Sequence, residues 1–134
     1  MLFLSKAGRF YTVGASGLII NYMVSVLLAH NSNVNFGYLQ STIVGIILSN
    51  ITNFVFNKFW TFEDRDFNIK KTLKQYALFA GITSGGAAIQ LGSLYLLLES
   101  GFSYEISLIT AVALASISNF LLNKKWTFGE KIWG

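Results

Sequence analysis

The amino-acid sequence predicts an all-α membrane protein with four transmembrane helices, built as two parallel repeats of two helices with both termini in the cytoplasm. Three observations predict this fold: four long stretches lack charged residues, every basic residue lies outside them, and one motif occurs twice. Of the 134 residues, 53% are hydrophobic and 12% are charged, whereas soluble domains carry roughly 25% charged residues. We therefore expect the whole chain, residues 1–134, to form a single membrane domain.

Each predicted span is long and apolar enough to cross the hydrocarbon core of a bilayer, which takes about 20 mostly apolar residues. The four spans cover residues 10–29, 38–56, 76–98 and 106–122, and none of them contains Asp, Glu, Lys or Arg. A very apolar soluble bundle would instead need charged helix faces, which these segments lack. The sequence therefore predicts four membrane-spanning helices.

The distribution of basic residues predicts the orientation of the spans. Two basic residues precede the first span, five lie between the second and third, and three follow the fourth. The connections 31–37 and 99–105 contain no Lys or Arg. Because basic residues that flank a span stay in the cytoplasm, we expect both termini and the middle loop inside, and the two short loops outside.

The end of the second span is repeated at the end of the fourth. Residues 53–62 read NFVFNKFWTF and residues 119–128 read NFLLNKKWTF, at an offset of 66 positions. This offset holds upstream without a gap, while the first and third spans have diverged further and align Phe10 with Tyr76. Each repeat begins inside and contains two spans, so the repeats are predicted to be parallel, related by an axis along the membrane normal. The two repeats cover about residues 8–64 and 74–130.

Small and polar residues recur every four positions along the second and fourth spans. They are Ser41, Gly45, Ser49, Asn53 and Asn57 in the first repeat, and Ser107, Ala111, Ala115, Asn119 and Asn123 in the second. Residues four apart share a helix face, and small residues let helices approach closely in lipid. One interpretation is that the second and fourth spans, or their copies in a neighbouring subunit, pack along these faces. The other is that the asparagine end lines a polar groove for a substrate headgroup. The glycines of the first and third spans are predicted to be close-packing sites.

The chain offers no recognisable catalytic or metal-binding group. Its six acidic residues lie in loops or tails, His30 has no acidic or cysteine companion, and no phosphate-binding GxxxxGK[ST] loop occurs. Small cation-coupled exporters generally need a carboxylate inside the membrane, and the predicted spans contain none. We therefore expect neither an enzyme nor a proton-coupled exporter, and no cofactor or metal. The net charge of +4 lies at span ends, where it sets topology, so no nucleic-acid partner is expected.

The predicted cytoplasmic ends of the second and fourth spans carry the same basic and aromatic residues. Lys58 and Lys124 can extend toward the interface and meet a phosphate as point charges. With Arg9 and Lys74, which open the first and third spans, they could surround a phospholipid-like headgroup. The alternative is that all four are ordinary topology anchors. The expected aromatic anchors at the lipid headgroups are Trp60 and Trp126.

The repeated ending, NF followed by two hydrophobic residues and N-[KR]-x-W-[TV]-F, resembles the GtrA family. The resemblance covers about residues 8–130 and extends to chain length, span number and topology. It implies a small four-span protein of the bacterial cytoplasmic membrane that takes part in cell-surface polysaccharide synthesis. It further implies movement of a polyprenyl-phosphate-linked monosaccharide, such as undecaprenyl-phosphate glucose, from the inner to the outer leaflet. A glycosyltransferase there would attach the sugar to O-antigen or teichoic acid.

The resemblance gives candidate roles to the polar residues, because amides can replace the water that sugar hydroxyls lose on burial. The candidates for a sugar-binding polar groove are Asn53, Asn57, Asn119, Asn123, Asn50 and Asn21. The candidates for binding the phosphate are Lys58, Lys124, Arg9 and Lys125. Since the sequence shows no ATP site or intramembrane carboxylate, we expect bidirectional movement driven by removal of the sugar outside.

Two other functions stay open on the sequence alone. The chain could be a non-transporting scaffold or partner subunit of a polyprenyl-phosphate glycosyltransferase. It could also be an enzyme acting on the same lipid, although the missing acids disfavour this. Four spans make a thin wall around a sugar, so a homo-oligomer or a heteromeric complex is expected. The expected partners are therefore the lipid-linked sugar, membrane lipid, a glycosyltransferase and further copies of the chain.

Overall fold

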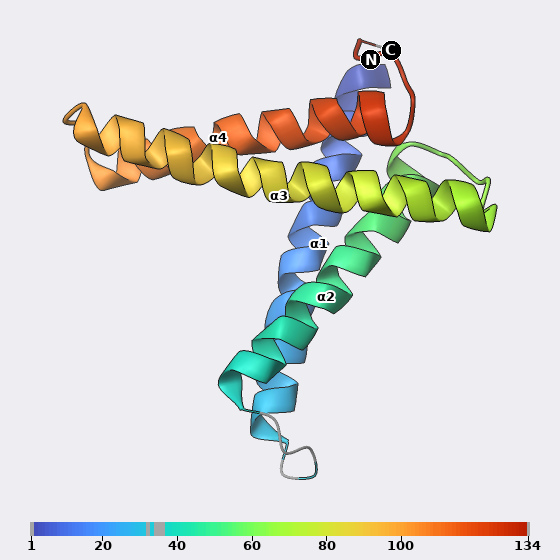
Figure 1. Ribbon diagram of the computed structural model, residues 1–134, viewed down its shortest axis with the longest axis horizontal. Coiled ribbons are helices and arrows are strands. Elements are labelled where there is room, and N and C mark those ends of the chain that lie inside the picture. The colour runs from blue at the N-terminus through green and yellow to red at the C-terminus, as the bar shows by residue number, and fades with distance from the viewer. Residues whose placement is uncertain (1, 32, 34–36, 134) are drawn as a thin grey trace. The chain divides into compact units, whose positions relative to one another are not determined.

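The computed structural model is all-helical and describes residues 2–31, 33 and 37–133. Its four long helices are α1 (Leu2–His30), α2 (Tyr38–Phe56), α3 (Ile69–Glu99) and α4 (Tyr104–Leu122) (Figure 1). Helices α2 and α4 each continue into one π-helical turn, η1 (Asn57–Thr61) and η2 (Asn123–Thr127). All four long helices are apolar and long enough to cross a membrane. The predicted all-α fold with four long apolar helices is confirmed.

The chain divides into two compact units, Met1–Arg65 and Asp66–Gly134, here called unit one and unit two. Helix α1 packs against α2 in unit one, and α3 packs against α4 in unit two. In both units the two helices run antiparallel and are joined by a short connection (Figure 1). Each unit is therefore a helical hairpin that ends in a π-helical turn.

The helices follow the predicted spans to within one residue at all four C-terminal ends and less closely at two N-terminal ends. Helix α2 covers the predicted residues 38–56, whereas α1 and α3 begin about two turns before their apolar stretches. These first turns contain basic residues, which the predicted spans exclude, and the chain has no proline that would stop a helix there. Asn68 caps α3, because its side-chain oxygen accepts hydrogen bonds from the backbone N–H groups of Lys70 and Lys71 at 3.1 and 3.4 Å.

The small-residue faces of α2 and α4 pack against the preceding helix of their own unit. A Cβ atom added to Gly45 would lie 2.7 Å from the backbone oxygen of Asn21 in α1, so the two backbones nearly touch. Ser41, Ser107 and Ala111 are fully buried along the same faces. The prediction that these faces join the second span to the fourth is therefore wrong. The short connections make each hairpin partner the nearest helix, and it occupies this face.

The structure also changes how the first and third spans align. Gly17 packs on Asn53 in unit one and Gly86 packs on Asn119 in unit two, so Gly17 and Gly86 are equivalent. Phe10 therefore corresponds to Phe79, and its predicted match with Tyr76 is wrong. The cause is the connection between the helices, which covers residues 31–37 in unit one but only 100–103 in unit two. A change in loop length shifts the register of everything before it.

The interior of each unit combines polar side chains with apolar ones such as Phe54 and Phe79, and its exterior is rich in large apolar side chains. The largest fully buried side chains are Lys58, Lys124, Asn57, Asn123, Thr61, Ser41 and Ser107. Large apolar side chains such as Leu18 and Ile109 are 73% and 70% exposed. This arrangement suits hydrocarbon surroundings, where apolar surface needs no burial and polar groups must find partners inside the protein.

Candidate functional site

The NKxWT sequence forms a π-helical turn at the end of the second helix in both units. The backbone N–H of Phe62 donates to the carbonyl of Asn57 at 2.9 Å, and that of Phe128 donates to Asn123 at 3.0 Å. Inside each turn a threonine hydroxyl, that of Thr61 or Thr127, donates to the Asn side-chain oxygen at 2.7 Å. Single π-turns occur frequently at functional sites. The two predicted groove residues Asn57 and Asn123 thus have local partners that fix the turn.

Each turn holds a buried lysine that forms an ion pair with a carboxylate six residues later; we call this pair the lysine clasp. The Nζ atom of Lys58 lies 2.9 Å from Oδ2 of Asp64, and the lysine side chain is 0% exposed. In unit two, Nζ of Lys124 lies 3.8 Å from Oε1 of Glu130, with the lysine again 0% exposed. Lys124 also donates to the backbone carbonyls of Lys131 and Ile132. The clasp ties the chain that follows the helix back onto the turn.

A residue with positive φ directly before the carboxylate lets the chain fold back. Glu63 has φ of 52° in unit one, and Gly129 has φ of 65° at the equivalent position of unit two. Glycine adopts this conformation without strain, whereas glutamate does so at a cost. The backbone N–H groups of Asp64 and Glu130 then donate to the carbonyls of the clasp lysines, both at 2.9 Å.

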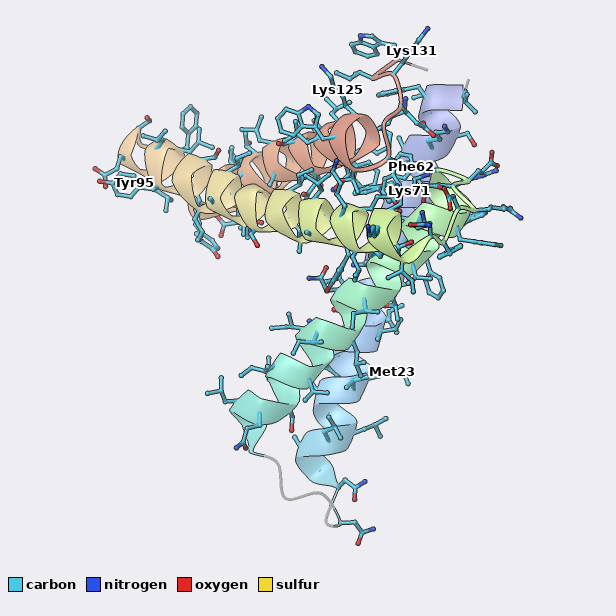
Figure 2. All side chains as sticks on the ribbon, turned by 45° about the vertical axis from the view of Figure 1, so that its right-hand side comes forward. Met23, Phe62, Lys71, Tyr95, Lys125 and Lys131 are labelled. Atoms are coloured by element: carbon cyan, nitrogen blue, oxygen red, sulfur yellow. The ribbon has the colours of Figure 1, made fainter. Side chains whose placement is uncertain are left out.

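Arg9 closes the turn of unit one from the side of α1. Its guanidinium donates to the Trp60 carbonyl at 2.9 Å and to the Glu63 carboxylate at 3.0 Å, and it stacks 5.5 Å from the Trp60 ring centroid. The structure thus brings together three residues predicted from the sequence, namely Arg9, Lys58 and Trp60. In unit two, Lys124, Lys125 and Trp126 share one turn, and Lys125 projects from it into the surroundings (Figure 2).

Two of the predicted amides lie at the helix crossings instead of in the turns. Asn53 packs on Gly17, where an added Cβ would lie 2.6 Å from Nδ2, and Asn119 packs on Gly86, where the same distance would be 3.0 Å. The Oδ1 atoms of both amides are buried and lack a hydrogen-bond partner among the residues that the structure describes. A buried acceptor without a donor costs free energy, so these positions suit a ligand that brings hydroxyl groups.

The two remaining candidate amides lie nearer the opposite end of unit one. The Oδ1 atom of Asn21 accepts a hydrogen bond from Ser25 at 3.2 Å and lies close to Gly45 of α2. Asn50 is half-buried on α2. The structure therefore spreads the six predicted amides over three levels, with two in the turns, two at the crossings and two beyond.

Sequence reasoning missed the carboxylates Asp64 and Glu130 and the threonines Thr61 and Thr127. All four recur at the same offset of 66 as the rest of the motif, so the signal was present. It is easy to overlook because an Asp aligns with a Glu at this position. A lysine at the end of a span also suggests a phosphate ligand before it suggests an ion pair within the protein. Across the described residues no cluster of three or more His, Cys, Asp or Glu is placed to hold a metal ion.

Comparison with known proteins matches most of the chain to one family. A sequence model of the family described as GtrA/DPMS, transmembrane domain, matches residues 9–128, which reach into all four long helices and include η1 and η2. The chain is also similar to the uncharacterized membrane protein YngA of Bacillus subtilis (strain 168), with 29% identity over 125 residues that cover 93% of this chain and 80% of that protein. The protein is therefore a multi-pass membrane protein that belongs to the GtrA/DPMS transmembrane domain family.

Proposed function

We propose that the protein moves a polyprenyl-phosphate-linked monosaccharide from the inner to the outer leaflet of the bacterial cytoplasmic membrane. The sugar would then be attached to a cell-surface polysaccharide or to teichoic acid. Membership of the family and four long apolar helices support a role inside the bilayer. The proposal includes no catalytic step, and removal of the sugar outside drives the net flow.

The buried amide oxygens of Asn53 and Asn119 carry this proposal. Each lies at the crossing of two apolar helices without a hydrogen-bond partner among the described residues. A sugar that leaves water must replace several hydrogen bonds, since an unpaired polar group in an apolar medium costs several kcal/mol. In the proposed path, sugar hydroxyls donate to these two oxygens, and the prenyl chain stays in the lipid.

The orientation belongs to the same proposal. The basic residues cluster at one end of every span, and such residues stay in the cytoplasm. Both termini, the middle loop and the two lysine clasps would then lie on the cytoplasmic side, and the two hairpins would be parallel repeats. The substrate phosphate would therefore first meet the protein at the level of the clasps.

The proposed phosphate ligands differ in how accessible they are. Arg9 and Lys125 are partly or largely exposed, so a phosphate can approach them directly. Lys58 and Lys124 are fully buried against carboxylates, so a phosphate can bind them only by replacing that carboxylate. One anion then takes the place of another, and the buried ammonium stays paired throughout.

The test is exchange of a labelled polyprenyl-phosphate sugar across liposomes that contain the pure protein. Label that becomes accessible to a membrane-impermeant reagent is expected to appear faster than in empty liposomes. Replacing both crossing amides, by Asn53→Leu and Asn119→Leu, should slow this exchange at least tenfold, the effect of losing about 1.4 kcal/mol of binding. Gln90→Leu removes a half-buried amide of α3 outside the proposed path and should leave the rate unchanged.

Exchange no faster than in empty liposomes, from protein whose helical content is intact, would contradict the proposal. It would favour the alternative that the chain is a scaffold or partner subunit of a glycosyltransferase. Co-purification with such an enzyme would then be the next measurement.

A further inference from the structure

Both units contain an apolar groove at the same place, between their two helices and beside the tryptophan of the turn. The groove of unit one has a volume of about 410 Å³ and is lined by Thr12, Val13, Ser16, Phe56, Phe59 and Trp60. The groove of unit two has about 390 Å³, and its lining includes Gly81, Ile82, Gly85, Leu122 and Trp126. In the register set by the Gly17 and Gly86 crossings, these five positions coincide with five of the six in unit one. The hollow is thus a property of the repeat, since it forms with Thr and Ser as well as with glycines.

The glycines that line the groove of unit two play no part in packing its helices. A Cβ atom added to Gly81 or Gly85 would meet nothing within 4 Å, whereas one added to Gly86 would contact Asn119. Helix α3 therefore carries one glycine where α4 crosses and three that face open space, two of which line the groove. Their effect is to deepen a groove on the apolar surface, which in a bilayer is filled either by lipid or by another helix.

The two grooves differ at the end that approaches the turn. In unit one this end is occupied by Arg9, which pairs with Glu63 and stacks on Trp60. The equivalent positions of unit two hold Leu78 and Gly129, which offer neither a cation nor a carboxylate. Where unit one has the Arg9–Glu63 pair, unit two has a second hollow of about 220 Å³. This hollow shares Leu78 and Trp126 with the groove.

Two lysines of the first turns of α3 line this second hollow. Lys71 and Lys74 border it together with Gln75, Thr127 and the glycine that replaces Glu63. Lys71 lies 3.5 Å from Asp66, with both side chains about half exposed, so this ion pair is accessible and weak. Figure 2 shows Lys71 at the start of α3. Lys74 is exposed. An apolar groove thus ends at two amines within reach of water.

We propose that unit two binds a phosphate-bearing lipid here, with one hydrocarbon chain in the groove and the phosphate between Lys71 and Lys74. Charge complementarity selects this occupant: two cations at the mouth of an apolar groove match an anionic head on an apolar tail. A neighbouring helix would fill the groove but would leave the two lysines unexplained. One part of this inference rests on the proposed function, namely that the bound lipid is the substrate before it is moved from the cytoplasmic leaflet. At the equivalent place in unit one, Arg9 and Glu63 pair with each other instead.

Quenching of Trp126 fluorescence by brominated lipid chains tests the proposal. The full-length protein, with Trp60→Phe and Trp133→Phe so that Trp126 is the only tryptophan, is placed in phosphatidylcholine nanodiscs. A few per cent of a brominated lipid is added, either phosphatidic acid or phosphatidylcholine with the same chains. Phosphatidic acid is expected to quench at roughly tenfold lower content, the order expected for two lysines near a lipid phosphate. A reporter that keeps only Trp60 should show no difference between the two lipids.

Two pairs of variants separate the headgroup site from the groove. Lys71→Gln with Lys74→Gln should abolish the preference for phosphatidic acid, whereas Lys70→Gln with Lys131→Gln, which removes the same charge from exposed positions outside the hollow, should keep it. Gly81→Leu with Gly85→Leu should fill the groove and reduce quenching by both lipids, whereas Gly92→Leu, equally open, should not. Added inorganic phosphate should not displace the brominated lipid.

Several outcomes would overturn the inference. Equal quenching by the two lipids would exclude a headgroup site, and displacement by inorganic phosphate would exclude a role for the chain. Trp126 shielded from both lipids would show that a helix of a second copy fills the groove. Lipid exchange across liposomes is measured separately, so a preference for phosphatidic acid without exchange would contradict the proposed function alone. Normal exchange without that preference would contradict only this inference.

Discussion

At the end of α2 the ammonium group of Lys58 is fully buried and lies 2.9 Å from the Asp64 carboxylate. A buried charge is tolerated only when it is paired and hydrogen-bonded. The partner is local in sequence, and the residue before it turns the backbone through positive φ so that the two can meet. The lysine of the family-like motif therefore has a structural role in each hairpin, whatever anion it binds during function.

The clasp predicts a strongly non-additive response to mutation. Asp64→Leu removes the carboxylate that lies 2.9 Å from the buried Lys58 ammonium and should lower the free energy of unfolding by about 3–5 kcal/mol. The double variant Lys58→Met, Asp64→Leu removes both charges and should recover most of that loss. Denaturant unfolding in detergent micelles, followed by circular dichroism, measures both. If the double variant instead lost the sum of the two single-variant free energies, Lys58 and Asp64 would not be energetically coupled.

The weaker geometry of the second clasp provides a matched comparison. The Lys124–Glu130 distance is 3.8 Å, and Lys124 also donates to two backbone carbonyls. Glu130→Leu should therefore cost less than Asp64→Leu in the same assay, because the ion pair that it removes is the longer one and Lys124 keeps two backbone carbonyls. An equal or larger loss would mean that the carboxylates act by something other than pairing.

At the scale of the helices, packing depends on a few glycines rather than on all of them. Gly17, Gly45 and Gly86 each meet a side chain or backbone of the partner helix, whereas Gly14, Gly81, Gly85 and Gly92 face open space. The sequence predicted close packing for the glycines of both first helices, because spacing alone does not reveal which side of a helix is covered. Only the position of the partner separates the two kinds.

Replacing one glycine of each kind by alanine tests this distinction. Gly17→Ala would place a Cβ against Asn53 and should destabilise the protein by about 1–3 kcal/mol, as overpacking does. Gly14→Ala has room and should be neutral, or stabilising by up to about 1 kcal/mol through helix propensity. Thermal unfolding in detergent distinguishes the two. Similar melting temperatures for both variants would contradict the crossing at Gly17.

The limits of the sequence at this scale have physical causes. Helix α2 matches the predicted 38–56 span because its apolar stretch and its helix coincide, whereas α1 and α3 start earlier because helical structure does not need apolar residues. The alignment of Phe10 with Tyr76 was wrong because similarity between the first helices is too weak to reveal a shorter connection. The grooves were invisible, since they depend on which faces stay uncovered after the helices pair.

For the whole molecule, the distribution of basic residues predicts the orientation of the helices in the membrane. The chain contains no cysteine, so single cysteines report position without background. Phe67→Cys, in the connection between α2 and α3, and Trp133→Cys should react with an impermeant maleimide only after the cells are permeabilised. Phe102→Cys and Asn33→Cys should react from outside in intact cells. Phe67→Cys and Phe102→Cys labelled from the same side would contradict the predicted topology.

The place of the first clasp along the chain sets an order of events during synthesis. Asp64 lies six residues after Lys58, directly before the boundary of unit one at Arg65. The nascent chain can therefore pair this ammonium before α3 has left the ribosome, and units nearer the N-terminus generally fold first. Insertion would then proceed hairpin by hairpin, and the second hairpin would leave the ribosome when the charges of the first are already neutralised.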